Sequence, residues 1–402
     1  MFESSTGKMN LGIAKIALAL MAMTLPVSAL GDQCDPHWLL NQLDTSLNTP
    51  KPYLNNIDTA YTENYFILDP RVKLVLKGSI PKVRFFSITT ANAEIPNIGK
   101  SIRSGYLFDY QLIMDAGSIN PMIPGNPVNS TRTDFTLELL PPPKSATSSA
   151  PNVIHLADTT PIQTILVRYY SPDVGLSITP DILPTIYSEF VEDGSPAPCP
   201  YFLSPPTITN VPLPPSYGSP DPSTKVTFTE YSSAGGGSNA AAPFYLAARN
   251  SMKSGQVAVI RLKSPHFINT RSGTGLFPDP NTYDMRYWSL NVGDPTISNT
   301  VGGLPDYLAK LDARGYVTLV VSRDSSGQIQ TAAASRGQNF IPDRRNPRAT
   351  SMLFMYRNLL VSPSFLETDP KNPNLKIYPP EYLPIGVICE AADYLADKCN
   401  LD

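Results

Sequence analysis

An aromatic five-residue stretch that occurs twice is the strongest constraint on how this chain can fold. Residues 84–88 read Arg-Phe-Phe-Ser-Ile, and residues 286–290 read Arg-Tyr-Trp-Ser-Leu. Each copy follows an apolar run that ends at a proline, at residues 72–81 in the first half and 257–265 in the second. We also match the aromatic strand and Asp-rich turn at 106–115 with those at 316–324. Self-similarity over such a distance predicts the duplication of one β-rich unit.

Short segments that alternate between apolar and polar residues follow one another along the first half. We predict strands at 61–68, 72–76, 84–89, 109–114, 133–139 and 162–170, with 72–76 and 84–89 paired across a turn at 78–81. Short strands separated by turn residues are typical of antiparallel sandwiches and jelly rolls. The predicted fold is therefore all-β with a few short helices, as two related β-sandwich or jelly-roll-like units in tandem.

Only a few segments favour a helix. Asp35 and Pro36 are suited to a helix cap and a first helical position, so they predict a short helix over 35–43. Pro305 and Gly315 similarly frame a predicted helix over 304–313, which leads into a strand at 316–321. Residues 351–361 fit either a strand or a helix, and we favour a strand at their start.

Two segments rich in proline, glycine and serine mark a boundary in the middle of the chain. Between residues 196 and 222, ten of 27 residues are proline, a density that is incompatible with the interior of a sheet. Residues 232–238, Ser-Ser-Ala-Gly-Gly-Gly-Ser, are typical of a flexible linker. We predict a first β-sandwich unit at 30–204, a linker at 205–242, and a second β-sandwich unit with a C-terminal helix at 243–402.

The N-terminus has the pattern of a signal peptide. Lys8 and Lys15 precede an apolar segment at 16–25 that is too short to span a bilayer. Pro26-Val27-Ser28-Ala29 then supplies a helix breaker and small residues, so we predict a signal peptide at 1–29, with Gly31 as the alternative cleavage position. The mature protein is expected to be periplasmic or extracellular. No later stretch is apolar for long enough to predict a membrane span.

Export predicts that the four cysteines form disulfides. They are Cys34, Cys199, Cys389 and Cys399. A continuous helix between the last two would hold their Cα atoms about 15 Å apart, too far for a bond between them. In that case each pairs with Cys34 or Cys199, which we favour. If the helix breaks, Cys389 and Cys399 bond to each other instead.

Low charge and abundant proline favour a loop-rich exported protein over a cytosolic enzyme. Charged residues make up 16% of the chain, and there are 42 prolines and 20 tyrosines. The formal net charge is -3, with no concentrated block of Lys and Arg, so no nucleic-acid partner is predicted. No oligomeric state and no cofactor are predicted.

Several motifs together resemble a known group of proteins. The stretch at 85–88, the run Ile-Leu-Val-Arg-Tyr-Tyr-Ser-Pro-Asp at 165–173, and Ile-Leu-Pro at 182–184 resemble a β-sandwich domain of unknown function. That domain occurs in uncharacterised exported bacterial proteins. Residues 287–290 and 357–358 look like a diverged second copy, so the resemblance covers about two thirds of the chain. It implies a duplicated β-sandwich fold and brings no catalytic residue with it.

The repeated arginines are the best candidates for a site. We favour a structural role, in which each lies over an aromatic ring of its own sheet or pairs with a carboxylate. The alternative is an aromatic groove for a glycan or a peptide, with hydrogen-bonding groups beside it. The ligand-binding candidates are Arg84, Arg286, Tyr287, Trp288, Asp294 and Arg323.

Catalytic signatures are weak. Three histidines are scattered without metal-ligand spacing. Asp109, Asp115 and Asp134 can hold a cation or act as a carboxylate pair, but strand-end aspartates are mostly turn residues. We leave catalysis open and favour a non-catalytic exported protein that binds a ligand or serves as a scaffold. The alternative is an exported carbohydrate or ester hydrolase that uses carboxylates in the cleft between the halves.

Alternation along a strand also predicts which side chains of the repeated stretch are buried. Phe86, Ile88, Trp288 and Leu290 share the faces with two large apolar residues, so they are expected to point into the two cores. Tyr287 lies on the opposite face, where truncation is expected to cost little unless a second layer covers it.

Overall fold

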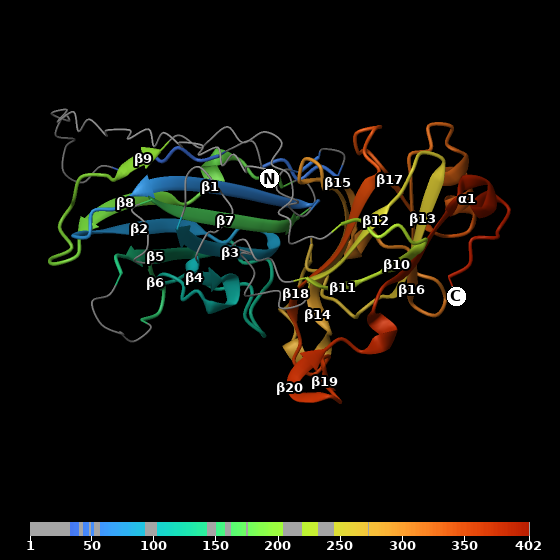
Figure 1. The fold of residues 1–402 in the computed structure, drawn as a ribbon. Coiled ribbons are helices and arrows are strands. Elements are labelled where there is room, and N and C mark those ends of the chain that lie inside the picture. The colour runs from blue at the N-terminus through green and yellow to red at the C-terminus, as the bar shows by residue number, and fades with distance from the viewer. Residues whose placement is uncertain are drawn as a thin grey trace, which may run out of the picture.

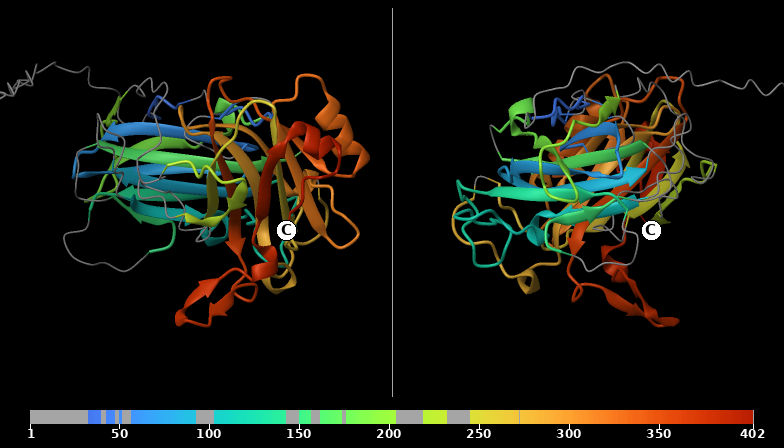
Figure 2. Two further views of the ribbon diagram at one scale, coloured as in Figure 1. Left: turned by 45° about the vertical axis from the view of Figure 1, so that its right-hand side comes forward. Right: turned by 90° about the vertical axis from the view of Figure 1, so that its left-hand side faces the viewer.

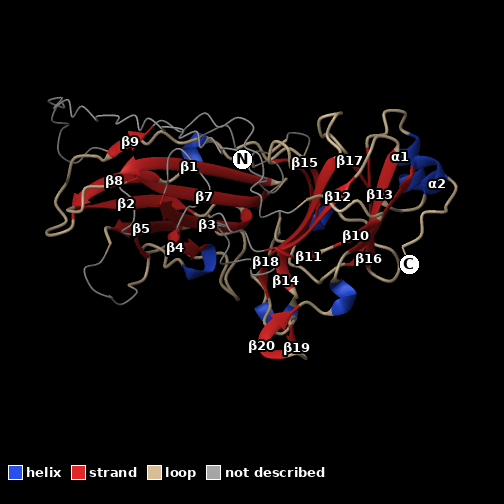
Figure 3. Cartoon of the chain, viewed as in Figure 1, coloured by secondary structure: helices blue, strands red, loops and turns tan. Residues whose placement is uncertain are grey.

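We describe the protein from a computed structural model. It describes residues 33–39, 43–47, 50–51, 57–92, 103–142, 150–156, 162–173, 176–203, 219–231, 245–271 and 273–401. The expected signal peptide at 1–29 and much of the expected linker lie outside these residues. Strands dominate the described chain and helices are few and short, which confirms the predicted all-β class (Figure 3).

The first unit, at the left of Figure 1, contains two sheets. A five-stranded sheet has the order β4-β3-β7-β1-β9, and a four-stranded sheet has the order β6-β5-β2-β8. The strands are β1 (Thr59–Ile67), β2 (Val72–Ser79), β3 (Val83–Asn92), β4 (Arg103–Phe108), β5 (Asp134–Leu140), β6 (Val153–His155), β7 (Ile162–Pro172), β8 (Thr185–Phe190) and β9 (Tyr201–Leu203).

The second unit contains two five-stranded sheets, β11-β12-β18-β14-β15 and β10-β21-β13-β16-β17. A separate two-stranded ribbon, β19-β20, projects away from the body of the molecule (Figure 2). The strands are β10 (Lys225–Thr227), β11 (Thr229–Tyr231), β12 (Tyr245–Ser251), β13 (Gln256–Lys263), β14 (Met285–Asp294), β15 (Asn299–Pro305), β16 (Tyr316–Ser322), β17 (Asn339–Pro342), β18 (Ser351–Val361), β19 (Glu367–Asp369), β20 (Asn372–Ile377) and β21 (Ile385–Glu390).

The two units repeat the same strand order. The run β4-β3-β7-β1 corresponds to β15-β14-β18-β12, and β6-β5-β2-β8 corresponds to β17-β16-β13-β21. Both units contain one parallel pair at the same place, β5 with β6 and β16 with β17. A matched pair of glycines marks the repeat, because a Cβ atom on Gly105 would lie 2.7 Å from Ile154 and one on Gly302 would lie 2.8 Å from Ile341. Neither position has room for a side chain.

The repeated stretch lies on β3 and β14, and both faces of these strands are buried. Phe86 and Ile88 point into the core between the sheets of the first unit, and Trp288 and Leu290 into that of the second, as alternation predicted. The opposite faces meet between the units, where Tyr287 packs in a third apolar cluster with Tyr61, Phe85, Phe108, Tyr170 and Leu359. The second layer over Tyr287 is thus the other unit.

Two of the predicted helices do not form in the residues that the structure describes. β15 continues to Pro305, and only one 3-10 turn follows, η7 (Asp306–Leu308), so no helix spans 304–313. Residues 35–39 are not helical. Cys34 donates its N–H to the Ile186 carbonyl and Leu39 donates to that of Glu63, so the chain here is bound to neighbouring strands instead. The helices that do form, α1 (Gln328–Ser335) and α2 (Ala391–Leu395), pack outside the sheet that contains β13 and β16.

Some strand expectations also change. β2 pairs with β5 and β8, while β3 pairs with β4 and β7, so the chain changes sheet at residues 80–82 rather than forming a hairpin there. Residues 109–111 form a 3-10 turn, η3, not a strand. The counterpart of β4 and η3 is β15 and η7, so matching 106–115 with 316–324 was wrong. Residues 225–231, within the expected linker, form two strands of the second unit.

The disulfide pairing differs from the one we favoured. Cys34 bonds to Cys199 and Cys389 bonds to Cys399, with Cα separations of 5.7 and 6.0 Å. The long-range alternative required a continuous helix between the last two cysteines. Instead α2 ends at Leu395, and the chain reverses through Asp397, whose φ is 59°. This reversal brings Cys399 back to β21, where Cys389 lies.

Candidate functional site at the junction of the two units

Two buried ion pairs join the units reciprocally. Arg84, on β3 of the first unit, pairs with Asp306 of the second. Arg286, at the matching position on β14, pairs with Asp109 of the first unit, with Nη1 2.6 Å from Oδ1. All four side chains are at most 4% exposed. Because each unit gives one arginine and receives one, the junction has the self-complementary character of a two-fold interface.

Each aspartate is held in place by a backbone N–H of its own unit and also contacts the arginine of the other unit. Asp109 and Asp306 open the matching turns η3 and η7. Asp109 Oδ2 accepts the backbone N–H of Phe86 at 2.8 Å, and Asp306 Oδ2 accepts that of Trp288 at 3.1 Å. The backbone of the repeated stretch therefore positions the carboxylates, and its arginines cross the junction to reach them.

The sequence analysis did not identify Asp109 and Asp306 as matching residues of the two halves. Asp109 was expected at the start of a strand and Asp306 within a helix. The available signal is an Asp-Tyr dipeptide, at 109–110 and again at 306–307, following each copy of the repeated stretch. Matching these dipeptides, instead of the turns at 115 and 324, would have aligned the two units correctly.

Aromatic rings cover both arginines. The Arg84 guanidinium lies 5.2 Å from the ring centroid of Tyr287 and 5.3 Å from that of Phe267. The Arg286 guanidinium lies 5.0 Å from the centroid of Phe277. We expected each arginine to lie over a ring of its own sheet or to pair with a carboxylate. Instead, both rings beside Arg84 belong to the second unit, and the carboxylate partner of each arginine comes from the opposite unit.

A third carboxylate, Asp58, is buried beside these pairs. The Tyr287 hydroxyl donates to Asp58 Oδ1 at 2.5 Å, and Ser171 Oγ donates to the other oxygen. Burial raises the pKa of Asp58 and of Asp109 above the ordinary value, against the opposing effect of the nearby arginines. Burial likewise raises the pKa of Asp306 from 3.8 to about 6, although Arg84 lowers it. The junction thus holds three carboxyl groups that are costly to ionise.

A second matched set of residues lies at the same junction. Arg168 on β7 lies 5.8 Å from the ring centroid of Tyr61, and Arg357 on β18 lies 5.2 Å from that of Tyr245. The hydroxyls of Tyr61 and Tyr170 are 2.9 Å apart. Burial raises the pKa of the Tyr170 hydroxyl well above its ordinary value, so this group stays neutral. Each of these contacts lies within one unit. The contact of this set that crosses the junction is the packing of Tyr170 on Tyr287, with ring centroids 5.7 Å apart.

The remaining predicted site residues lie elsewhere. Trp288 is fully buried in the core of the second unit. Asp294 ends β14 and accepts the backbone N–H of Thr296 at 3.0 Å and of Asn346 at 3.2 Å. Arg323 pairs with Asp343 at 2.8 Å and donates to backbone carbonyls at residues 346, 347 and 349. Asp294 and Arg323 therefore both contact the loop at 343–349 and hold it in place.

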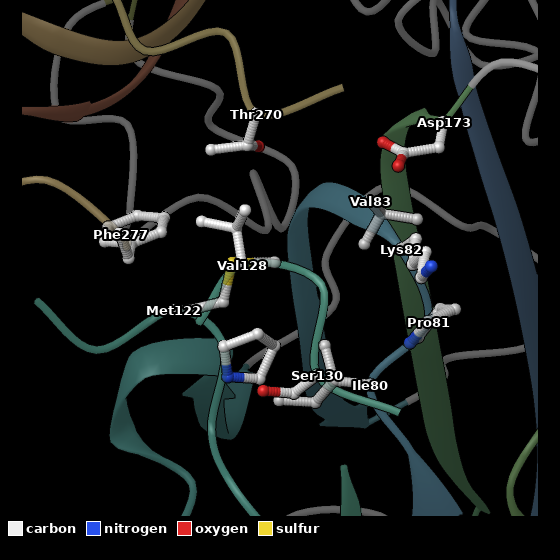
Figure 4. Close-up of a pocket in the computed structure, with 11 residues that line it drawn as sticks. Ile80, Pro81, Lys82, Val83, Met122, Val128, Ser130, Asp173, Thr270 and Phe277 are labelled. Atoms are coloured by element: carbon white, nitrogen blue, oxygen red, sulfur yellow. The ribbon is translucent and has the colours of Figure 1, made fainter. Parts of the chain in front are cut away.

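A small crevice lies where a loop of the second unit reaches the first (Figure 4). Phe277 exchanges backbone hydrogen bonds with Gly125 and Asn126, at 2.9 and 2.7 Å. The crevice has a volume of about 20 Å³, enough for one water molecule. Asp173 is the single carboxylate among its lining residues. Ligand pockets usually enclose roughly 300–1,000 Å³, so a sugar ring does not fit here.

The other aspartates considered for a cation serve local structure. Asp134 accepts hydrogen bonds from Ser79 and Ser118, and Asp115 accepts one from Thr136 at 3.1 Å. No group of three or more His, Cys, Asp or Glu side chains with metal-binding geometry occurs among the described residues. In the same part of the chain, no helix is long and apolar enough to cross a membrane.

Comparisons with known proteins find a similar fold but indicate no function. No family model and no curated protein matches the sequence. A crystal structure of an uncharacterized protein from Burkholderia cenocepacia is similar, with a TM-score of 0.52 and 13% sequence identity, covering 89% of this chain and 85% of that one. A protein from Vibrio parahaemolyticus has 11% identity and a TM-score of 0.42, covering 86% of this chain and 92% of that one. At this identity the Burkholderia protein shows a shared fold alone.

Proposed function

We propose that this chain is an exported, non-catalytic protein in which two β-sandwich units act as one rigid scaffold for binding a ligand. The observation that carries the proposal is the reciprocal pairing of Arg84 with Asp306 and of Arg286 with Asp109. In these pairs, the arginines of the repeated stretch hold the two units in one arrangement. A fixed arrangement favours a binding surface that extends over a rigid body.

Export is supported by the N-terminal pattern and by the cysteines. All four cysteines form disulfides, which persist in oxidising compartments. The mature chain is expected to begin near Leu30 and to contain no free thiol. N-terminal sequencing of the exported fraction and thiol counting after denaturation without reductant check both points. An intact Met1 in that fraction, or reactive thiols, would contradict them.

The ligand surface that we propose is the aromatic row at the end of β4. Tyr106 stacks on Phe108 with centroids 4.7 Å apart, and Phe108 lies 5.9 Å from Tyr110. Tyr106 and Tyr110 are 40% and 39% exposed, whereas Tyr287 and Trp288, the stacking residues of the alternative that we did not favour, are fully buried. Exposed tyrosine rings suit the apolar face of a sugar, so a glycan is the ligand we propose.

Glycan-array binding of the mature protein tests this surface. Tyr106→Ala is expected to weaken binding of any retained glycan at least about tenfold, by removal of one stacked ring. The matched control is Tyr187→Ala, because Tyr187 is half-buried on the outer face of another sheet under Lys77. Equal binding by both variants, or no binding of the mature protein to any glycan on the array, would overturn the glycan assignment.

The hydrolase alternative gains no support from the carboxylates between the units. A glycosidase needs two carboxyl groups about 5 to 9.5 Å apart with substrate between them. Asp58, Asp109 and Asp306 are each at most 2% exposed and are held by arginine, hydroxyl or backbone donors. Their position supports a structural role, so we do not propose hydrolysis.

A further inference from the structure

Three polar side chains face one another in the core of the second unit. They are Trp288 on β14 and Tyr356 and Asn358 on β18, and each is fully buried. Trp288 and Asn358 are directly opposite each other across the two strands. Tyr356 lies two residues away on the same face, and its ring centroid is 6.1 Å from that of Trp288.

The polar atoms of these side chains have no hydrogen-bond partner among the residues that the structure describes. The atoms are Trp288 Nε1, the Tyr356 hydroxyl, and both Oδ1 and Nδ2 of Asn358. An indole N–H donates, a hydroxyl donates and accepts, and an amide does both at separate atoms. Buried polar groups are nearly always bonded to protein or to ordered water, so four such atoms on neighbouring side chains of one core face are consistent with a common partner.

The first unit provides an internal comparison. By strand register, Trp288 corresponds to Phe86, Tyr356 to Val167 and Asn358 to Tyr169. At two of the three positions the first unit therefore has an apolar side chain in its core. The fold does not require polar groups here. Their occurrence together in the second unit indicates that they serve one shared contact.

We propose that the core of the second unit encloses a water site formed by Trp288, Tyr356 and Asn358. Water fits the chemistry, because the three neighbouring side chains are uncharged and present both donors and acceptors. An ion would lack a charged partner among these three groups, and a larger molecule would displace the surrounding core side chains. The site lies on the face of β14 opposite to the junction, so it is independent of the glycan surface proposed above.

Single and double variants test this site through unfolding in urea. Tyr356→Phe and Asn358→Leu are each expected to lower the folding equilibrium constant about tenfold, because each removes a partner of the bound water. The double variant is expected to lose less than the product of the two, since both changes disrupt one network. The control is Tyr169→Phe, because the Tyr169 hydroxyl is buried alone and has no partner among the described residues.

Two results would overturn the proposal. One is that Tyr356→Phe and Asn358→Leu leave the folding constant unchanged or raise it, as expected for Tyr169→Phe. The other is that their effects multiply without coupling. For variants that do not fold, the wild-type protein supplies the measurement, because the indole N–H of Trp288 should show a nuclear Overhauser effect to a long-lived water. A Trp38→Phe background assigns that signal, and a silent indole N–H would contradict the site.

Discussion

At the scale of single residues, the repeated aromatic stretch shows how one strand can serve two cores. Trp288 faces the interior of its own unit, and Tyr287, its neighbour in sequence, faces the other unit. Tyr287 also donates to Asp58 and packs on Tyr170, with centroids 5.7 Å apart. Its burial therefore depends on the presence of the first unit.

This dual burial predicts similar costs for two truncations that strand alternation alone ranks differently. Trp288→Ala and Tyr287→Ala are each expected to lower the free energy of unfolding by about 3–5 kcal/mol, as large aromatic truncations in a core do. Urea unfolding followed by circular dichroism measures both. Tyr187→Ala, on an outer sheet face, is the control and should cost about 1 kcal/mol or less. A Tyr287→Ala protein as stable as this control would refute the buried junction.

Asp306 predicts an unusual dependence of stability on pH. Its pKa in the folded protein is about 6, above its ordinary value of 3.8, so the folded state binds this proton more tightly than the unfolded state does. The penalty from this group is complete above pH 6 and is relieved as pH falls toward 3.8. From pH 7 to pH 4.5, wild type should gain about 2 kcal/mol relative to Asp306→Asn. Parallel pH profiles for the two proteins would contradict this assignment.

At the scale of elements, the two disulfides restrain very different lengths of chain. Cys34–Cys199 spans 165 residues and ties the segment before β1 to the end of the first unit, whereas Cys389–Cys399 spans 10 and ties α2 to β21. Chain entropy favours the longer loop as the stronger restraint.

The two double variants in which serines replace one disulfide are therefore expected to differ in stability. Replacing Cys34 and Cys199 should cost about 5 kcal/mol, and replacing Cys389 and Cys399 about 3 kcal/mol, since loop-closure entropy grows with loop length. Denaturant midpoints of the two double variants, measured without reductant, give the order. A larger loss for the Cys389/Cys399 variant would show that α2 contributes more through packing than the chain-entropy argument allows.

At the scale of the whole molecule, the junction connects segments that are far apart in sequence. Besides the reciprocal ion pairs, Lys51 exchanges two backbone hydrogen bonds of 2.8 Å with Thr300 on β15. Ile57 donates its N–H to the side chain of Asn291 at 3.0 Å. The chain before β1 thus reaches the second unit, and the loop at Phe277 reaches the first, so the units hold each other from both sides.

The reciprocal pairs predict coupled losses. Arg84→Ala and Arg286→Ala should each cost about 3–5 kcal/mol, because each leaves a buried carboxylate without its partner. The double variant should lose less than the sum, since the second change acts on a junction that is already weakened. Arg261→Ala is the control, because its pair with Asp312 is partly exposed and should contribute at most about 1 kcal/mol. Simple additivity in urea unfolding would argue against one cooperative junction.

Much of the architecture within each unit was determined by the sequence alone. Alternation identified the inward side chains of β3 and β14, and the turn residues between strands predicted the all-β class. The duplication was visible in the arginine-aromatic stretch itself. These features rest on interactions between residues near in sequence, where local periodicity and backbone preference decide the outcome.

Only the tertiary structure determined which side chains interact with each other across the fold. Arg84 meets Asp306, 222 residues away, and no local pattern links them. Pro305 and Gly315 suggested a helix, but the strand through Pro305 delivers Asp306 to the junction instead. The pairing of Cys389 with Cys399 likewise depended on where α2 ends. For Arg84 and Asp306 the deciding free energy comes from surfaces that exist only once both units are folded and packed. For the two cysteines it comes from the packing of α2 on the sheet of the second unit.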